Sequence, residues 1–160
     1  MVKQTMFKLL VIVAMLVSTT LLATENDFSV TVSSDLFTVA DEAKKRHVPV
    51  MMFFAAEDCE FCERLEADYL AAMSHSDEYK DKVIIRKVMI DSYQDINDFS
   101  GKSVSAETFS NQFNIQVTPT LMLVNHEGKK LTKNIVGYNR SGFFGAYLDE
   151  AIDSAHQRIH

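Results

Sequence analysis

The stretch from Val50 to Cys62, VMMFFAAEDCEFC, decides the fold of this 160-residue chain. A continuously apolar run, typical of a strand buried on both faces of a sheet, is followed by two cysteines that open a helical pattern. Cys59 and Cys62 are the only cysteines, and their spacing lets them close a disulfide within one helical turn. The helix N-terminus stabilises the first sulfur as a thiolate. The spacing predicts a dithiol redox centre, in which one thiolate attacks a disulfide and the second releases the mixed intermediate.

Two other uses of the cysteine pair are weaker. Zinc usually takes four ligands, but there is no second cysteine pair, and the five histidines are scattered without a ligand spacing. A purely structural disulfide would stabilise the fold little, because it closes so short a loop. We therefore expect no metal and no other cofactor, and interpret the Cys59–Cys62 disulfide as the redox-active group.

The N-terminus is typical of an export signal. Lys3 and Lys8 form a basic start, and residues 9–23 are an uncharged apolar stretch. A spanning helix needs roughly 20 apolar residues, so we expect residues 1–23 to be a signal peptide that is cleaved after Ala23. An uncleaved membrane anchor is the alternative. Export would place the dithiol in an oxidising compartment, which we expect to be a bacterial periplasm.

The rest of the chain has the length of one domain. We expect residues 24–34 to form an N-terminal extension, in which alternating Phe28, Val30 and Val32 add a short strand, and residues 35–160 to form the domain itself. Without the signal the chain keeps 14 basic and 22 acidic side chains, and no basic cluster. This balance argues against nucleic acid as a partner.

Apolar periodicity predicts alternating helices and strands in the domain. Helices are expected from Ser34 or Asp35 to about Arg46, from Cys59 to about Met73, from Ser105 and from Ser141, and strands over residues 50–55, 83–90, 120–124 and 131–136. The first of these helices places Leu36, Phe37, Val39, Ala40 and Ala43 on its apolar side, and the second places Cys62, Leu65, Tyr69 and Met73. The glycine-containing loop 125–129 favours an antiparallel hairpin between the last two strands.

With this order of elements and the CxxC motif, the chain resembles the thioredoxin superfamily from about Asp35 to Ala155. The resemblance implies an α/β thioredoxin fold, with a central mixed sheet of about four to five strands flanked by helices, built as βαβ and then ββα. Thr118-Pro119-Thr120 looks like the family's cis-proline loop, which lies against the dithiol and offers backbone groups to the substrate. Three further positions match the family's pattern: Pro49 before the central strand, Lys87 beneath the active site and Gly137 after the last strand.

Within the superfamily the chain resembles the exported SoxW-like thioredoxins. The shared features are a long connection after the second central strand, a TPT loop and an "EGKK…GY" hairpin, here residues 127–130 and 137–138. The resemblance implies a thiol–disulfide oxidoreductase that reduces disulfide-bearing periplasmic proteins, with electrons from a membrane thiol donor. We expect a monomer that binds neither nucleic acid nor metal.

The expected site residues have distinct roles. Cys59, nearer the exposed end of the helix, is expected to be the nucleophile, and Cys62, one turn further in, the buried resolving thiol. Thr118 and Pro119 are expected to bind substrate. Four residues are expected to tune the site: Asp58, Glu60, Phe61 and Lys87.

The chain also departs from the thioredoxin pattern. Phe53 replaces the buried carboxylate six residues before the first cysteine, which removes the usual proton acceptor for Cys62 and leaves the role of Lys87 open. Ala67 replaces the proline that kinks the active-site helix, and the tryptophans around the motif are absent.

An acidic collar surrounds the dithiol: Glu57, Asp58, Glu60 and Glu63. Each exposed carboxylate disfavours the thiolate by about 0.3–0.5 kcal/mol, so two or three offset much of the about 0.3–1 kcal/mol that the helix dipole supplies. A less stabilised thiolate makes the couple more reducing, and we expect a reductant. Glu63 and Glu66 are interpreted as part of a solvated helix face.

Other functions remain open. An oxidase or isomerase could have the same fold, but oxidases favour a basic or histidine-containing dipeptide where this chain has Glu60-Phe61, and isomerases usually carry a dimerisation module for which there is no room. A binding or chaperone module would not need both cysteines and the Thr-Pro loop. Residues 92–104, in a connection longer than thioredoxin's, are either a neutral insertion or part of a partner surface.

Overall fold

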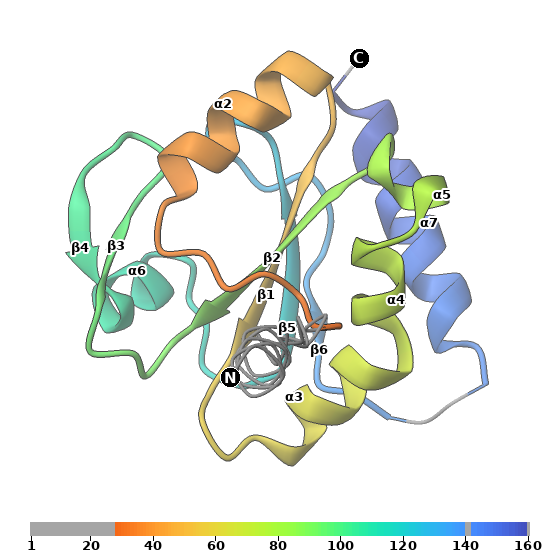
Figure 1. The fold of residues 1–160 in the computed structure, drawn as a ribbon, viewed down its shortest axis with the longest axis horizontal. Coiled ribbons are helices and arrows are strands. Elements are labelled where there is room, and N and C mark those ends of the chain that lie inside the picture. Colours follow the sequence, from red (N-terminus) through yellow and green to blue (C-terminus); the bar gives the residue numbers. More distant parts are fainter. Residues whose placement is uncertain (1–27, 140–141, 160) are drawn as a thin grey trace, which may run out of the picture.

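The computed structural model describes residues 28–139 and 142–159. Four strands form a mixed sheet in the order β2-β1-β5-β6 (Figure 1). β1 (Val50–Ala55) pairs in parallel with β2 (Ile84–Met89) and antiparallel with β5 (Thr120–Val124), and β6 (Ile135–Val136) pairs antiparallel with β5. The predicted architecture, a βαβ unit followed by a ββα unit around a mixed sheet, is confirmed.

Helices cover both faces of the sheet (Figure 1). One face carries α2 (Leu36–Arg46) and α6 (Ala106–Gln112). The other carries α7 (Phe144–Gln157) and the helix that follows the cysteines, which consists of α3 (Glu60–Leu65), a π-helical turn η1 (Glu66–Leu70) and α4 (Ala71–Ser74). The short α5 (Asp77–Lys80) completes the connection to β2.

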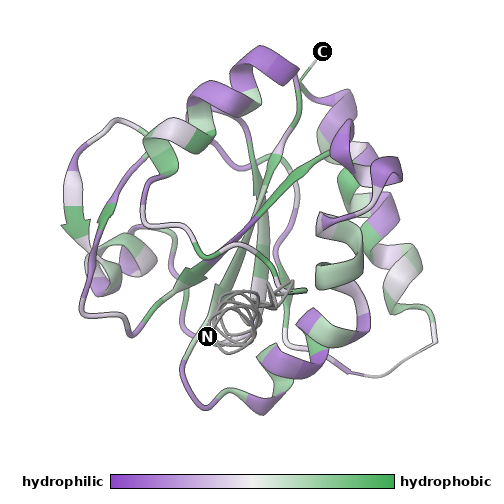
Figure 2. Cartoon of the chain, viewed as in Figure 1, coloured by the Kyte–Doolittle hydropathy of each residue, from purple (hydrophilic) through white to green (hydrophobic). Residues whose placement is uncertain are grey.

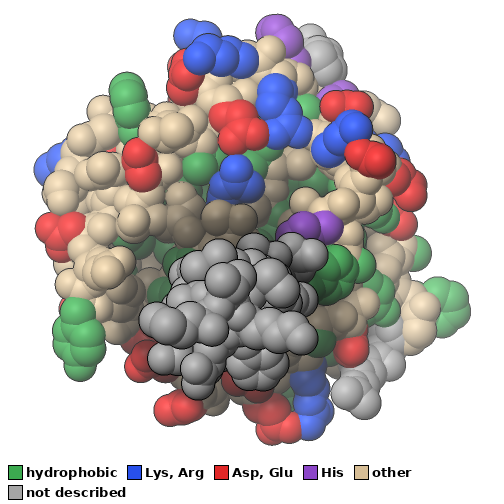
Figure 3. Space-filling model, viewed as in Figure 1, with side chains coloured by type: hydrophobic (Ala, Val, Ile, Leu, Met, Phe, Trp, Pro, Cys, Tyr) green, Lys and Arg blue, Asp and Glu red, His purple; other side chains and the backbone are tan. Residues whose placement is uncertain are grey.

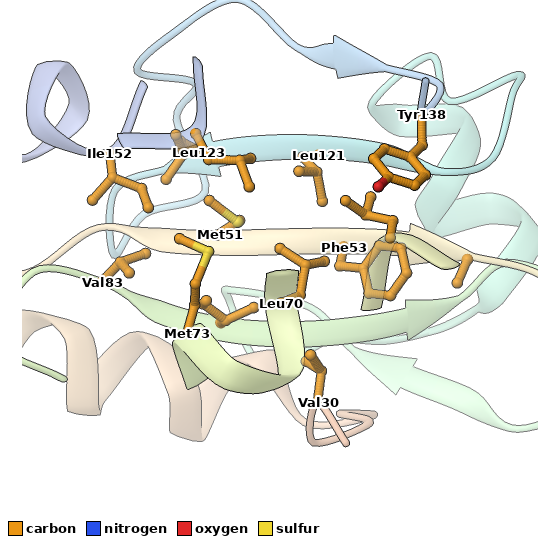
Figure 4. Packing of buried hydrophobic residues seen from close by; sticks show 14 of the residues in the cluster. Val30, Met51, Phe53, Leu70, Met73, Val83, Leu121, Leu123, Tyr138 and Ile152 are labelled. Atoms are coloured by element: carbon orange, nitrogen blue, oxygen red, sulfur yellow. The ribbon is translucent and has the colours of Figure 1, made fainter. Parts of the chain in front are cut away.

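The central strand β1 divides the core into two clusters. All six of its residues are buried, as the apolar run predicts. Met51 and Phe53 face the cluster under α3, α4 and α7, whereas Met52 and Phe54 face the cluster under α2 and α6. Figure 4 shows the first cluster, in which Phe53, Leu121 and Tyr138 lie together near one end of the strands and Met51 and Ile152 near the other. The apolar residues concentrate on the sheet and the inner faces of the helices (Figure 2).

Two helices begin at the cap residues that the sequence predicts. The Asp35 side chain accepts the Thr38 backbone N–H at 3.2 Å, and Ser105 Oγ accepts the Thr108 N–H at 3.1 Å. The predicted cap of the last helix, Ser141, lies outside the described residues. The predicted inner face of α7 is confirmed, since Phe144, Leu148 and Ile152 are buried.

Three details of the predicted elements are wrong. The π-helical turn η1 shifts the phase of the helix after Leu65, because a π turn holds more than 3.6 residues, so Leu70 is fully buried and Tyr69 only half-buried. The strand predicted over 131–136 is interrupted by the polar run 132–134, which breaks the two-residue alternation, and only β6 remains. Phe37 is exposed on α2, although its ring lies beside Gly101.

The connection between β2 and α6 contains a second, smaller sheet. β3 (Asp95–Asn97) and β4 (Ser103–Ser105) pair antiparallel, and Ile96 and Val104 are buried against α2 and α6. The Asp98 carboxylate accepts hydrogen bonds from the N–H groups of Ser100 and Lys102 at 2.8 and 3.0 Å, which shape the turn between β3 and β4. Residues 92–104, expected to be a neutral insertion or part of a partner surface, thus contribute Ile96 and Val104 to the core, whereas most of their other side chains are exposed.

The N-terminal segment crosses the molecule beside β2. Val32 forms a single parallel bridge with Lys87, and Val30 is buried in the cluster under α3. The alternation of Val30 and Val32 thus produces one bridge in place of the predicted short strand. Among the described residues, no helix combines the length and apolar character needed to cross a membrane.

Candidate active site

Cys59 and Cys62 lie where the chain passes from β1 into α3. Cys59 is the N-cap of α3, and its Sγ accepts the Cys62 backbone N–H at 3.3 Å. The two cysteines form a disulfide, with their Cα atoms 5.2 Å apart. Cys62 is buried in the core and Cys59 is half-buried. Cys59 is therefore the sulfur that is more accessible to another disulfide.

A second loop lies against the dithiol. The Thr118–Pro119 peptide bond is cis, as the TPT sequence predicts. Thr118 Oγ1 donates a hydrogen bond to Cys59 Sγ at 3.5 Å. The Gly137 N–H donates to the Pro119 carbonyl at 2.8 Å, which ties the end of β6 to the same loop. The structure thus brings Cys62 and Thr118 to Cys59 Sγ, and Gly137 binds the neighbouring Pro119 of the same loop.

The turn between β1 and α3 is fixed from the side of β2. The Glu57 N–H donates to Asp91 Oδ2 at 2.8 Å. Asp58 has φ +53°, in the left-handed region that aspartate adopts more readily than most residues. Asp58, predicted only as a charge that tunes the site, therefore also shapes the turn that presents Cys59.

Lys87 is held by a carboxylate that sequence analysis missed. Its Nζ lies 2.5 Å from Glu66 Oε2, and the exposed fractions of the two side chains are only 16% and 14%. Glu66 Oε1 accepts the Val30 N–H at 2.7 Å, and Lys87 Nζ also lies 5.9 Å from the centre of the Phe53 ring. The interpretation of Glu66 as part of a solvated face is wrong, because this side chain joins the active-site helix to β2 and to the N-terminal segment.

The spacing of Glu66 could have revealed this role. It lies four residues after Cys62, and residues four apart on a helix share a face. Because Cys62 was expected to point into the core, the same spacing would have placed Glu66 toward the core, and not in the solvated face to which it was assigned. A glutamate on the inner face of a helix requires a partner, and Lys87 was the available cation on the neighbouring strand.

The acidic collar is exposed, as expected, but one of its members is paired. Glu57, Asp58, Glu60 and Glu63 all face solvent. Arg64 forms an i,i+4 ion pair with Glu60 and lies 5.9 Å from the centre of the exposed Phe61 ring. The charge of Glu60 is therefore partly balanced by a cation on the next turn of α3.

The described part of the chain contains no group of three or more histidine, cysteine, aspartate or glutamate residues placed to hold a metal ion. The reactive group in this part of the molecule is the cysteine pair itself.

The comparisons with known proteins agree with this geometry. A family model described as "Thioredoxin-like domain" matches residues 36–152. The chain belongs to the thioredoxin-like domain family. A search of curated proteins found no significant match to it.

Solved structures of thioredoxins are similar to this member of the family. Oxidised thioredoxin O2 from Arabidopsis thaliana is 22% identical, with a TM-score of 0.52, 78% of this chain covered and 92% of that one. Oxidised mitochondrial thioredoxin 3 from Saccharomyces cerevisiae is 18% identical, with a TM-score of 0.52 and coverage of 78% and 93%. The periplasmic thioredoxin SoxS from Paracoccus pantotrophus is 17% identical, with a TM-score of 0.46 and coverage of 67% and 98%, and we draw no inference from it.

The family and the fold confirm two predictions. The first is the thioredoxin fold itself, and the second is the enzyme class. Thioredoxin-fold homologues are thiol–disulfide oxidoreductases that act on disulfide-bearing substrates, and this thioredoxin-like chain has the CxxC-spaced pair on which that chemistry depends. The similarity to SoxW-like proteins in particular stays a prediction.

Proposed function

We propose that this protein is an exported thiol–disulfide oxidoreductase that works mainly as a reductant of protein disulfides in the periplasm. The observation that carries the proposal is the placement of the two sulfurs. Cys59 is half-buried at the N-cap of α3, beside the cis-proline loop, and Cys62 is buried directly behind it. This is the arrangement in which an outer thiolate attacks a substrate and an inner thiol releases it.

In the proposed reaction two electrons pass from the protein to the substrate. The Cys59 thiolate attacks one sulfur of a substrate disulfide, the substrate S–S bond breaks, and the leaving thiolate takes up a proton. Cys62 then loses its proton and attacks Cys59 Sγ, which releases the second substrate thiol and forms the Cys59–Cys62 disulfide. A membrane thiol donor of the same chemical class would restore the dithiol by the reverse exchange.

The acidic collar supports the reducing direction. Exposed carboxylates near Cys59 oppose its thiolate, and a dithiol whose thiolate is less stabilised is a stronger reductant. Two observations favour the alternative, an oxidase of the same fold: the Thr118 hydroxyl donates to Cys59 Sγ, and Arg64 pairs with Glu60. Both stabilise a thiolate at Cys59. We favour the reductant because three exposed acidic side chains of the collar, Glu57, Asp58 and Glu63, disfavour the Cys59 thiolate, whereas these two contacts stabilise it.

The proposed compartment depends on the N-terminal sequence. Lys3, Lys8 and the apolar stretch 9–23 lie outside the described residues, and the proposal of a signal peptide cleaved after Ala23 depends on their order alone. Mass spectrometry of periplasmic material is expected to begin at or near Thr24. Recovery of only full-length chain in the membrane fraction would favour the anchored form.

Trapping experiments test the assignment of the two sulfurs. Cys62→Ser is expected to accumulate mixed disulfides with partner proteins, because the resolving thiol is gone, whereas Cys59→Ser is expected to trap none. Non-reducing gels followed by mass spectrometry would detect the adducts. Equal trapping by the two variants would contradict the proposed roles, and absence of adducts together with absence of insulin-reducing activity would contradict the proposed function.

A further inference from the structure

A pocket of about 340 Å³ opens beside the turn that presents Cys59. It lies between the end of β1 and the end of β2, and its lining residues are Glu57, Met89, Asp91, Ser92, Tyr93 and Gln94. Glu57 is two residues before Cys59, a stretch of chain that spans at most about 7 Å. The pocket therefore lies close to Cys59 along the chain, on the side where the chain leaves β2.

The chemistry of the lining suits a long cationic side chain. Glu57 and Asp91 contribute two carboxylates to the lining, and the hydrogen bond from the Glu57 backbone N–H to Asp91 Oδ2 at 2.8 Å holds the two residues side by side. Tyr93 is fully exposed, at 104%, and an aromatic side chain with no packing partner is unusual. Half-buried Met89 supplies an apolar surface. The methylene groups of a lysine or arginine would pack on Met89, and its charged end would lie between the two carboxylates and the Tyr93 ring.

The size and the charge around the pocket agree with this ligand. Its volume is at the lower end of the range for small-molecule sites, so it holds one side chain more readily than a cofactor. The two cations described near the dithiol, Arg64 and Lys87, are paired with Glu60 and Glu66. Acidic side chains gather along the lower edge of the molecule in Figure 3, where α3 begins in Figure 1. The described residues that line the pocket hold two carboxylates and no cationic side chain, so the charge of the lining is negative.

We propose that this Glu57–Asp91 pocket binds a lysine or arginine of the substrate polypeptide, close in sequence to the cysteine that Cys59 attacks. The inference extends the proposed function, because it names the class of polypeptide that the dithiol reduces: disulfides flanked by basic residues. Tyr93 and Glu57 are then specificity-determining residues that do not take part in the exchange itself.

Matched peptide disulfides test the pocket. Two peptides differ only at the positions two residues before and after the cysteine, which are lysine in one and glutamine in the other. At low ionic strength the purified protein is expected to reduce the lysine peptide with a second-order rate constant about five- to tenfold higher. In 0.5 M NaCl the ratio is expected to fall below about twofold, because exposed charges are then screened.

Variants of the lining residues test whether the preference for the lysine peptide comes from this pocket. Glu57→Gln and Tyr93→Ser are each expected to reduce the lysine preference to about twofold, whereas Tyr93→Phe, which keeps the ring, is expected to retain it. The matched control is Glu78→Gln, which removes the same charge from exposed α5 and is expected to keep the full preference. A preference that survives both Glu57→Gln and Tyr93→Ser would overturn the assignment to this pocket.

A binding measurement separates this inference from the proposed function. Peptides with serine in place of cysteine are titrated into the oxidised protein, and amide resonances of Glu57 and Tyr93 are expected to shift with the lysine peptide and not with the glutamine peptide. Such shifts without any disulfide reduction would support the pocket and contradict the proposed function. Reduction of both peptides at equal rates would overturn the pocket and leave the proposed function intact. Neither shifts nor reduction would overturn both.

Discussion

Arg86 and Lys87 are neighbours on β2, point to opposite faces of the sheet, and each pairs with a glutamate of a helix. Arg86 lies 3.1 Å from Glu42 of α2, with exposed side-chain fractions of 23% and 39%, whereas the Lys87–Glu66 pair is the more deeply buried of the two. The Arg86 pair joins two elements at the rim of the core. The Lys87 pair joins β2, the active-site helix and the N-terminal segment.

The side chains on the two faces of the sheet therefore differ in kind. The cluster under α2 and α6 contains aromatic and aliphatic side chains, with Ser110 satisfied by the Ala106 carbonyl at 2.7 Å. The cluster under α3 contains Cys62, the proposed resolving cysteine, and lies against the Lys87–Glu66 pair. We infer that the first face supplies stability alone, and that changes on the second alter both stability and redox chemistry.

The largest expected effect comes from the two phenylalanines of β1. Phe53→Ala and Phe54→Ala each remove a fully buried ring and are expected to lower the free energy of unfolding by about 3–5 kcal/mol in urea titrations. Only Phe53 shares a cluster with Cys62 and contacts Lys87. The reduction potential is therefore expected to change in Phe53→Ala and to stay constant in Phe54→Ala, and equal shifts in both would break the division between the faces.

The two ion pairs give the next largest effect. Glu66→Gln leaves the largely buried Lys87 ammonium, 16% exposed, without its counter-charge and is expected to cost about 1–3 kcal/mol of unfolding free energy. Glu42→Gln is the matched variant on the opposite face, and a cost of about 0–1 kcal/mol is expected there because that pair is more exposed. A double variant, Glu66→Gln with Lys87→Met, is expected to recover part of the loss. Equal costs for Glu66→Gln and Glu42→Gln would contradict the contrast.

A charge change in the collar is expected to move the redox couple slightly. Glu60→His replaces a charge that opposes the Cys59 thiolate, frees Arg64, and is expected to raise the potential by about 10–20 mV. Asp41→His makes the same type of change on exposed α2 and is expected to leave the potential unchanged. Parallel redox titrations of the two variants measure the effect, and a lower potential in Glu60→His would refute the role of the collar.

The smallest expected effect lies on the site-bearing face but far from the dithiol. The hydrogen bond from Tyr79 to Asp149 Oδ1, at 2.6 Å, raises the pKa of Tyr79 from 10.0 to about 12. The folded state therefore keeps the proton above pH 10, where the unfolded state loses it, so this contribution to stability is present below pH 10 and lost as the pH rises through about 12. Tyr79→Phe is expected to make the unfolding free energy less dependent on pH in this range. An unchanged pH slope would show that the hydrogen bond has no thermodynamic role.

The parts that were predicted from sequence depend on local patterns. A cysteine spacing, a buried apolar run and a cap residue act within a few positions, so β1, the dithiol, and the starts of α2 and α6 were all predicted correctly. The missed features depend on distant partners. The π turn after Leu65 has no simple sequence signature, and the burial of Glu66 depends on Lys87 and Val30, which are 21 and 36 residues away. The β3–β4 ribbon was missed because each strand has a single inward residue, Ile96 or Val104. A strand with one inward residue is too short to show an alternating apolar pattern.

The equilibrium reduction potential of the Cys59–Cys62 pair tests the central claim most directly. The purified protein would be titrated against glutathione and dithiothreitol, with the fraction of disulfide read from mass shifts after thiol alkylation. The acidic collar predicts a value near the roughly −270 mV of thioredoxin. A value above about −180 mV, the range of disulfide isomerases, would contradict a reductant and make the oxidase the better interpretation.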